Sequence, residues 1–131
     1  MLDHLLLYTP ANLHDKTISF YEATLAPLGY KRTAEFADGN VVGFGDGSQH
    51  ADFWITSTAL KEDPTFQTGY IHLAFRAKDT KLVDECYIRG LDNGGKDNGP
   101  PGARPMYGST YYGAFLLDPA GNNMEVVKRE D

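Results

Sequence analysis

Two histidines stand at equivalent places in two similar stretches of the chain. His4 comes directly before the apolar run 5–7, and His72 comes directly before the apolar run 73–75. Towards the other end of the chain, Glu125 lies in a segment with strand character. Neutral imidazole nitrogens and a carboxylate can hold a divalent metal ion together and leave positions open for substrate or oxygen. We therefore expect His4, His72 and Glu125 to converge on one metal, although each residue taken singly also fits a structural or surface position.

The first half of the sequence predicts one strand, one helix and three further strands. Residues 2–9 are apolar and end at Pro10, which cannot continue a hydrogen-bonded ladder. Residues 15–25 carry apolar side chains at helical spacing, with Asp15 or Thr17 as the N-cap. The three strands are separated by Asp-Gly turns and are expected at 30–36, 41–45 and 51–56.

The second half repeats this order after a polar connection at 59–68. A strand is expected at 70–77, a helix at 80–91, and later strands beginning near Gly94 and covering 111–117 and 123–128. The fold class that follows is α+β, with two βαβββ modules forming a curved mixed sheet around a cavity. We expect one domain over 1–131, with modules at about 1–58 and 69–131.

Composition excludes several classes of partner. The formal net charge of -6 and the lack of a Lys/Arg cluster argue against nucleic acid, and no apolar run approaches the roughly 20 residues needed to cross a bilayer. The single cysteine, Cys86, cannot form an internal disulfide, and no apolar leader opens the sequence, so we expect a cytoplasmic protein. His14 and His50 are expected at the solvated surface, and Cys86 in the core.

Four motifs carry a resemblance to a known family. They are Asp3-His4-Leu5, Ser19-Phe20-Tyr21 with Leu28-Gly29-Tyr30 after it, Ile71-His72-Leu73-Ala74-Phe75, and Leu117-Asp118-Pro119-Ala120-Gly121-Asn122-Asn123-Met124-Glu125. With them the chain resembles the vicinal oxygen chelate superfamily, which includes glyoxalase I, extradiol dioxygenases, fosfomycin-resistance enzymes and bleomycin-binding proteins. The resemblance implies paired βαβββ modules and places metal ligands at His4, His72 and Glu125.

One position departs from the glyoxalase I pattern. That enzyme would be expected to supply a fourth ligand, a glutamate, where this chain has Trp54. Indole cannot ligate a metal, so the chain is not a standard four-ligand glyoxalase I. The three-ligand pattern is more similar to extradiol dioxygenases, which usually have two such domains per chain. The resemblance also implies a homodimer in which modules pair across subunits.

The segment 94–113 is rich in glycine and proline and is expected to form a functional flap or a surface Ω-loop packed by its own tyrosines. Within it, Arg104 can clamp a carboxylate or phosphate, Tyr107 can bind substrate, and Tyr112 can act as a catalytic proton relay. Trp54 is expected either to stack on an aromatic ligand or to be an ordinary core residue.

The expected function is that of a metal-dependent enzyme acting on a small oxygenated substrate by bidentate chelation. Lyase, isomerase and ring-cleaving dioxygenase chemistry all remain open, with Fe, Mn, Ni or Zn as the divalent ion. The alternative is a metal-free protein of the bleomycin-resistance type that sequesters a small molecule. A third reading is a relative that has kept the fold and lost the chemistry.

Overall fold

A computed structural model describes residues 1–48 and 50–130 of the chain, and it contains two βαβββ modules. The first module comprises β1 (Leu5–Thr9), α1 (His14–Leu25), β2 (Lys31–Phe36), β3 (Val41–Gly45) and β4 (Phe53–Ser57). The second comprises β5 (His72–Arg76), α2 (Thr80–Asp92), β6 (Lys96–Ala103), β7 (Tyr112–Leu117) and β8 (Asn123–Lys128). The predicted α+β class and the repeated element order are confirmed.

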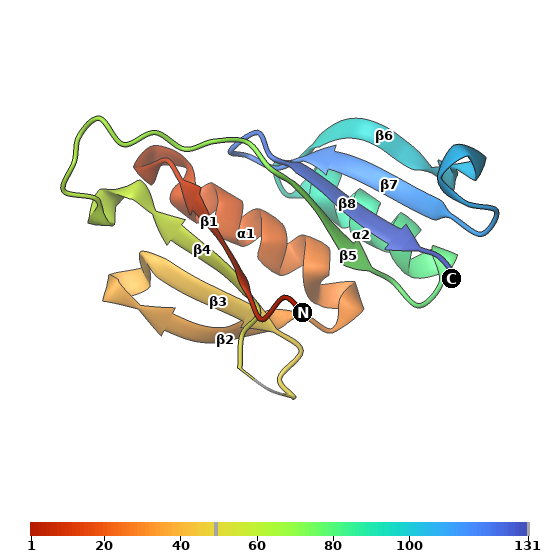
Figure 1. Ribbon diagram of the computed structural model, residues 1–131, viewed down its shortest axis with the longest axis horizontal. Coiled ribbons are helices and arrows are strands. Elements are labelled where there is room, and N and C mark those ends of the chain that lie inside the picture. The colour runs from red at the N-terminus through yellow and green to blue at the C-terminus, as the bar shows by residue number, and fades with distance from the viewer. Residues whose placement is uncertain (49, 131) are drawn as a thin grey trace.

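Each module forms its own four-stranded mixed sheet, in the orders β1-β4-β3-β2 and β5-β8-β7-β6. The first strand of each module pairs in parallel with the last, and the remaining neighbours are antiparallel. Figure 1 shows β1 and β5 running in opposite directions, and Leu5 of β1 lines a common hollow with Ala74 and Phe75 of β5. The two modules are thus turned head to tail relative to one another.

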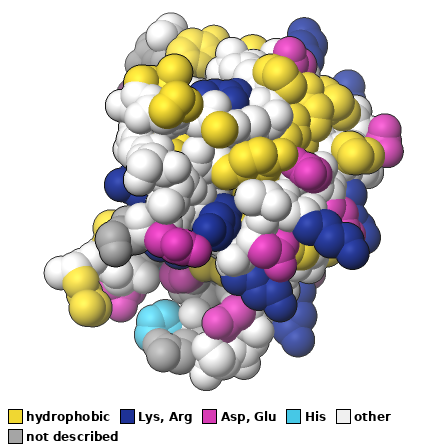
Figure 2. Space-filling model, turned by 90° about the vertical axis from the view of Figure 1, so that its right-hand side faces the viewer, with side chains coloured by type: hydrophobic (Ala, Val, Ile, Leu, Met, Phe, Trp, Pro, Cys, Tyr) yellow, Lys and Arg dark blue, Asp and Glu magenta, His cyan; other side chains and the backbone are white. Residues whose placement is uncertain are grey.

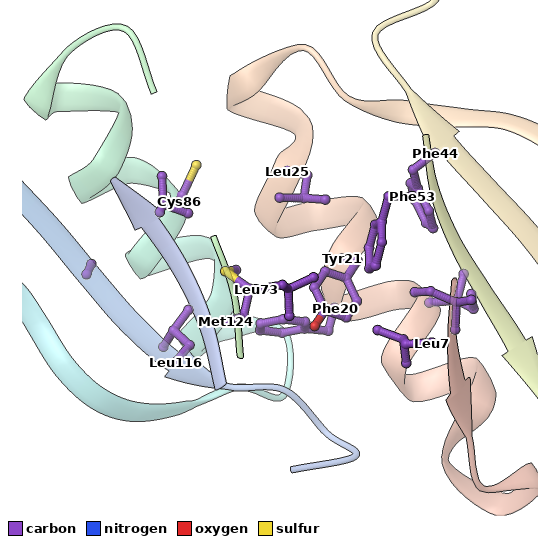
Figure 3. Close-up of a cluster of buried hydrophobic side chains, with 14 of the residues drawn as sticks. Leu7, Phe20, Tyr21, Leu25, Phe44, Phe53, Leu73, Cys86, Leu116 and Met124 are labelled. Carbon is purple, nitrogen blue, oxygen red and sulfur yellow. The ribbon is translucent and has the colours of Figure 1, made fainter. Parts of the chain in front are cut away.

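The hydrophobic core is shared by the two modules. Tyr21 of α1 packs edge-on against Phe53 of β4, with 4.9 Å between ring centroids. Its neighbour Phe20, which is fully buried, reaches Gly90 and Gly95 of the second module. Figure 3 shows α1 between the two sheets, with side chains from both converging on it. Burial of these large aromatic rings therefore holds one module against the other.

The glycine- and proline-rich segment is more ordered than a flap. Residues Lys96–Ala103 form β6, and only the following turn, with a short 3-10 helix at Pro105–Tyr107, is a loop. Pro100 and Pro101 are tolerated because β6 is at the edge of its sheet and both fall in the register shift between Gly99 and Gly102, where no residues are paired with β7. The pairing of β6 with β7 is irregular on both sides of Gly99.

The start of α1 differs from the prediction. The helix begins at His14, and its N-cap Leu13 makes no side-chain cap hydrogen bond, so neither Asp15 nor Thr17 is the cap. His14 was expected at the surface, but it is only 3% exposed. Its ring nitrogens lie 2.8 Å from the Thr9 hydroxyl and 2.8 Å from the Gly39 carbonyl, so both are satisfied inside the protein. The expected positions of His50 at the surface and of Cys86 in the core are confirmed.

Two surface features bear on the membrane and charge arguments made from the sequence. In residues 1–48 and 50–130, no helix combines the length and the apolar character that crossing a membrane requires. Figure 2 shows acidic and basic side chains interspersed on the side that faces right in Figure 1.

Candidate functional site

Strand register places His72 and Glu125 on the same face of the second sheet. Ala74 pairs with Glu125, and His72 is two residues before Ala74 on β5. Alternate residues of a strand face opposite sides, so both side chains lie on the face turned away from the helices. Met124 and Val126, which alternate with Glu125, are buried in the core on the other side.

His72 and Glu125 form a close pair. Nε2 of His72 lies 3.1 Å from Oε2 of Glu125, and the carboxylate side chain is only 3% exposed while the imidazole is 50% exposed. The other ring nitrogen, Nδ1, lies 3.1 Å from the Asn123 carbonyl oxygen. A carbonyl can only accept, so Nδ1 carries a proton. In the neutral ring, the lone pair of Nε2 then faces a carboxylate oxygen, and two acceptors in this position require a proton or a cation between them.

Tyr111 holds the other carboxylate oxygen. Its hydroxyl donates a hydrogen bond to Oε1 of Glu125. Burial, and then the Glu125 carboxylate, raise the pKa of Tyr111 to about 12, so the phenol keeps its proton at neutral pH. The guanidinium of Arg129 lies over the same ring, 5.2 Å from its centroid. Tyr111 thus fixes the orientation of Glu125 as a permanent donor.

Tyr112, the residue predicted as a proton relay, lies on the opposite face of the sheet. It pairs with Lys128 and shares the face of Ala114 and Val126, which pack on the helices. Its hydroxyl donates to Asp84 of α2 at 2.7 Å. The structure therefore brings Tyr111 to Glu125 and does not bring Tyr112 there.

The predicted substrate-binding residues Arg104 and Tyr107 lie beside this pair. The guanidinium of Arg104 is 5.6 Å from the centroid of Phe115, and the His72 ring stacks on the same phenylalanine with 6.1 Å between centroids. A hydrogen bond of 2.6 Å to the Pro100 carbonyl anchors Arg104. Tyr107 packs edge-on against Tyr111, at 5.3 Å.

His4 lies away from this cluster. Nδ1 of His4 is 2.6 Å from Oδ1 of Asp3, and the histidine side chain is 55% exposed. It lines a hollow of about 220 Å³ with Leu73, Ala74 and Phe75 of β5, and His72 does not line this hollow. Because β1 and β5 run in opposite directions, their first residues lie at opposite ends of the boundary between the two modules, which we call the seam. Across residues 1–48 and 50–130, no three His, Cys, Asp or Glu side chains are placed to hold one metal ion.

Trp54 belongs to the outer face of the first sheet. It pairs with Leu6 of β1 and stacks on Phe36, with 5.9 Å between centroids and 16° between planes. Its indole nitrogen donates to the Ala51 carbonyl at 3.2 Å. The indole ring is half-buried, so part of its aromatic surface is exposed on this outer face.

The model of the glyoxalase/bleomycin resistance protein/dioxygenase superfamily matches residues 1–126. The chain belongs to this superfamily. No curated protein sequence matches it. A glyoxalase/bleomycin resistance protein from Albidiferax ferrireducens T118 has 25% identity and a TM-score of 0.70, covering 95% of this chain and 97% of its own. A superfamily enzyme from Burkholderia phytofirmans PsJN has 16% identity and a TM-score of 0.73, covering 97% of each chain. A putative glyoxalase from Bacillus halodurans has 24% identity and a TM-score of 0.65, covering 98% of this chain and 96% of its own.

In this superfamily member, sequence reasoning missed the roles of Tyr111 and Phe115. The alternation of inward-facing and outward-facing residues along β7 would have placed both side chains on the face of Glu125. Ala114 and Leu116 are the apolar residues of β7 that face the helices. The residues that alternate with them therefore face outward, as Glu125 does. Both Tyr111 and Phe115 are among these outward-facing residues, whereas Tyr112 faces the helices.

A matched pair of glycine substitutions tests the position of Trp54. A methyl group on Gly43 would lie 2.8 Å from the indole ring and 2.8 Å from Cβ of Ala51. We expect Gly43→Ala to displace the ring, shift the fluorescence of the single tryptophan and lower the free energy of unfolding by about 1–3 kcal/mol. In the control Gly45→Ala, the nearest atom is 3.4 Å away, so emission and stability should stay close to those of the parent. Equal effects at both positions would contradict the placement of Trp54.

Proposed function

We propose that the protein is a divalent-metal-dependent enzyme acting on a small oxygenated substrate, with His72 and Glu125 as two of the metal ligands. One observation carries the proposal. Nε2 of His72 faces Oε2 of Glu125 at 3.1 Å while Nδ1 is committed to a backbone carbonyl. This separation lets both atoms bind one ion at the usual distances of about 2.0–2.2 Å. One imidazole and one carboxylate form a donor set that suits Fe, Mn, Ni or Zn. Each is already oriented by a second contact, His72 by the Asn123 carbonyl and Glu125 by the Tyr111 hydroxyl.

The residues around the pair have separate tasks. A divalent ion held there would supply Lewis-acid stabilisation of negative charge developing on two neighbouring substrate oxygens. Arg104 binds a carboxylate or other anionic oxygen of the substrate, and Tyr107 lines the same side. Tyr111 keeps Glu125 oriented by donating a hydrogen bond to its carboxylate. Lyase, isomerase and dioxygenase reactions all remain compatible with these roles.

The third ligand, His4, is proposed to come from a second copy of the chain in a homodimer. Within one chain, His4 lies at the other end of the seam from His72. The outer face of the first sheet carries exposed apolar side chains, including Leu6 at 41% and Phe36 at 59%, next to Trp54. Apolar surface of this kind gains free energy when it is covered. A two-fold dimer that sets this face opposite the His72 face of its partner would cover it and bring His4 of the partner subunit towards Glu125.

Metal analysis of protein purified without chelator tests the proposal. We expect about one divalent ion per chain, lost in both His72→Ala and His4→Ala. The alternative, a metal-free protein that sequesters an aromatic molecule, is favoured by the stacked surface of Trp54 and Phe36. An empty site together with tight aromatic binding that quenches Trp54 fluorescence would replace the first proposal with the second.

Two neighbouring tyrosines provide a matched test of the ligand pair. Tyr111→Phe removes the hydrogen bond to Glu125, and we expect it to weaken metal affinity by about 10–100-fold, as loss of an outer-shell partner does. Tyr112→Phe removes a hydrogen bond to Asp84 on the other face of the sheet and should leave metal affinity unchanged. Competition with a chromophoric chelator measures both values. A larger loss in Tyr112→Phe than in Tyr111→Phe would contradict the assignment of Tyr111 as the residue that orients Glu125.

A further inference from the structure

A hollow of about 700 Å³ lies where the start of α1 meets the end of β7, at the junction of the two modules, and neither His72 nor Glu125 lines it. One wall is the start of α1, with Leu13, Asp15, Lys16 and Ser19. The other wall comes from the second module: Asn93, Gly94 and Lys96, the last residue of β7, Leu117, and the turn residues Asp118 and Pro119. Its volume is in the range of small-molecule sites.

We propose that this hollow binds small amphiphilic anions, that is, molecules with a carboxylate or phosphate head on an apolar body. Leu13, Leu117 and Pro119 offer an apolar surface for the body. Lys16 and Lys96, one from each module, offer ammonium groups for the head. Within residues 1–48 and 50–130, neither lysine makes an ion pair.

The two carboxylates at the hollow do not cancel this preference. Asp118 accepts hydrogen bonds from the Tyr21 hydroxyl, from the backbone N–H groups of Ala120 and Asn122, and from the Asn122 amide. Its oxygens are therefore committed within the protein and are not available to a ligand. Asp15 is exposed at the first turn of α1, where the N-cap makes no side-chain hydrogen bond and the helix dipole favours negative charge. Asp118 keeps its negative charge, but these donors occupy its oxygens, so Lys16 and Lys96 are the groups left to contact an anionic head.

Binding to the purified chain of residues 1–131 can be measured by thermal shift and calorimetry with octanoate and octyl phosphate. Octanol tests whether the charged head is needed, and acetate and inorganic phosphate test whether the apolar body is needed. We expect at least one of the two amphiphilic anions to bind and raise the melting temperature, and the three other probes to have no effect. No shift with either amphiphile, or an equal shift with octanol, would overturn the proposal.

Variants locate the binding. The double variant Lys16→Ala/Lys96→Ala should weaken binding by about 10-fold or more, because it removes charge-assisted contacts. Ser19→Trp should block the hollow while both lysines remain. Lys81→Ala, which changes an exposed lysine on α2, is the control and should bind like the parent. Arg104→Ala should also bind like the parent; loss of binding there would assign the probes to the metal-site face and refute the proposal.

Discussion

Mixing a His4→Ala chain with a Glu125→Gln chain should restore metal sites that neither variant has alone. If each site combines His4 of one subunit with His72 and Glu125 of the other, a mixed dimer contains one intact site and one site that lacks both groups. Random pairing in equal amounts makes half of the dimers mixed, so about one quarter of the parental metal content and activity should return. In each variant by itself, metal affinity should fall by more than the roughly 100-fold expected when an outer-shell contact is lost.

The control for this experiment mixes His72→Ala with Glu125→Gln. These two residues belong to the same chain's half of the site, since their side chains are in contact. Every site in such a mixed dimer lacks one of them, so no metal should return. Recovery in this control, or no recovery in the first mixture with dimers present, would refute a site shared between subunits.

Removal of the Asp118 carboxylate should be among the most destabilising single changes in the protein. Asp118 is 4% exposed and accepts the Tyr21 hydroxyl at 2.6 Å, which ties α1 of the first module to the turn before β8 of the second. Asp118→Ala leaves this buried hydroxyl and two backbone N–H groups without their acceptor. We expect a loss of about 3 kcal/mol or more in the free energy of unfolding, measured by urea denaturation.

Tyr21→Phe isolates one of these hydrogen bonds and should cost about 1.5–3 kcal/mol, as expected for a bond to a charged group. Tyr87→Phe is the control, because its hydroxyl bonds to Asp97 at the exposed surface at 2.9 Å, and it should change stability by less than about 0.5 kcal/mol. Equal losses in the two variants would show that Tyr21 and Asp118 do not connect the modules.

The contact between Tyr21 and Asp118 makes the free energy of unfolding depend on pH in the alkaline range. Burial, and then the Asp118 carboxylate, raise the pKa of Tyr21 well above its ordinary value of 10.0. Below a pH of about 10, Tyr21 is protonated in both the folded and the unfolded state, and its full contribution is present. Above that pH, the unfolded state loses the proton while the folded state retains it, so the free energy of unfolding falls as pH rises. Tyr21→Phe should reduce this fall between about pH 10 and 11.

Elements whose signals are local were predicted well from the sequence. The strands at 41–45 and 123–128 match their predicted bounds, and the helix at 80–91 differs by one residue. The Asp38-Gly39 turn is formed with positive φ at both residues, as an Asp-Gly pair favours. The proximity of His72 and Glu125 could also be predicted, because the parallel neighbours β5 and β8 bring their side chains onto one face.

The sequence alone determined the order of elements, the repeated module, and two of the residues that meet at the candidate site. These depend on periodicity and turn chemistry within short segments, which neighbouring residues specify. Only the tertiary structure decided that His4 is separated from His72, because the direction of β1 against β5 follows from how the two modules pack through α1. It likewise decided that His14 is buried and that the proline-rich segment is an edge strand. Both outcomes depend on contacts between residues far apart in the chain, which no local pattern encodes.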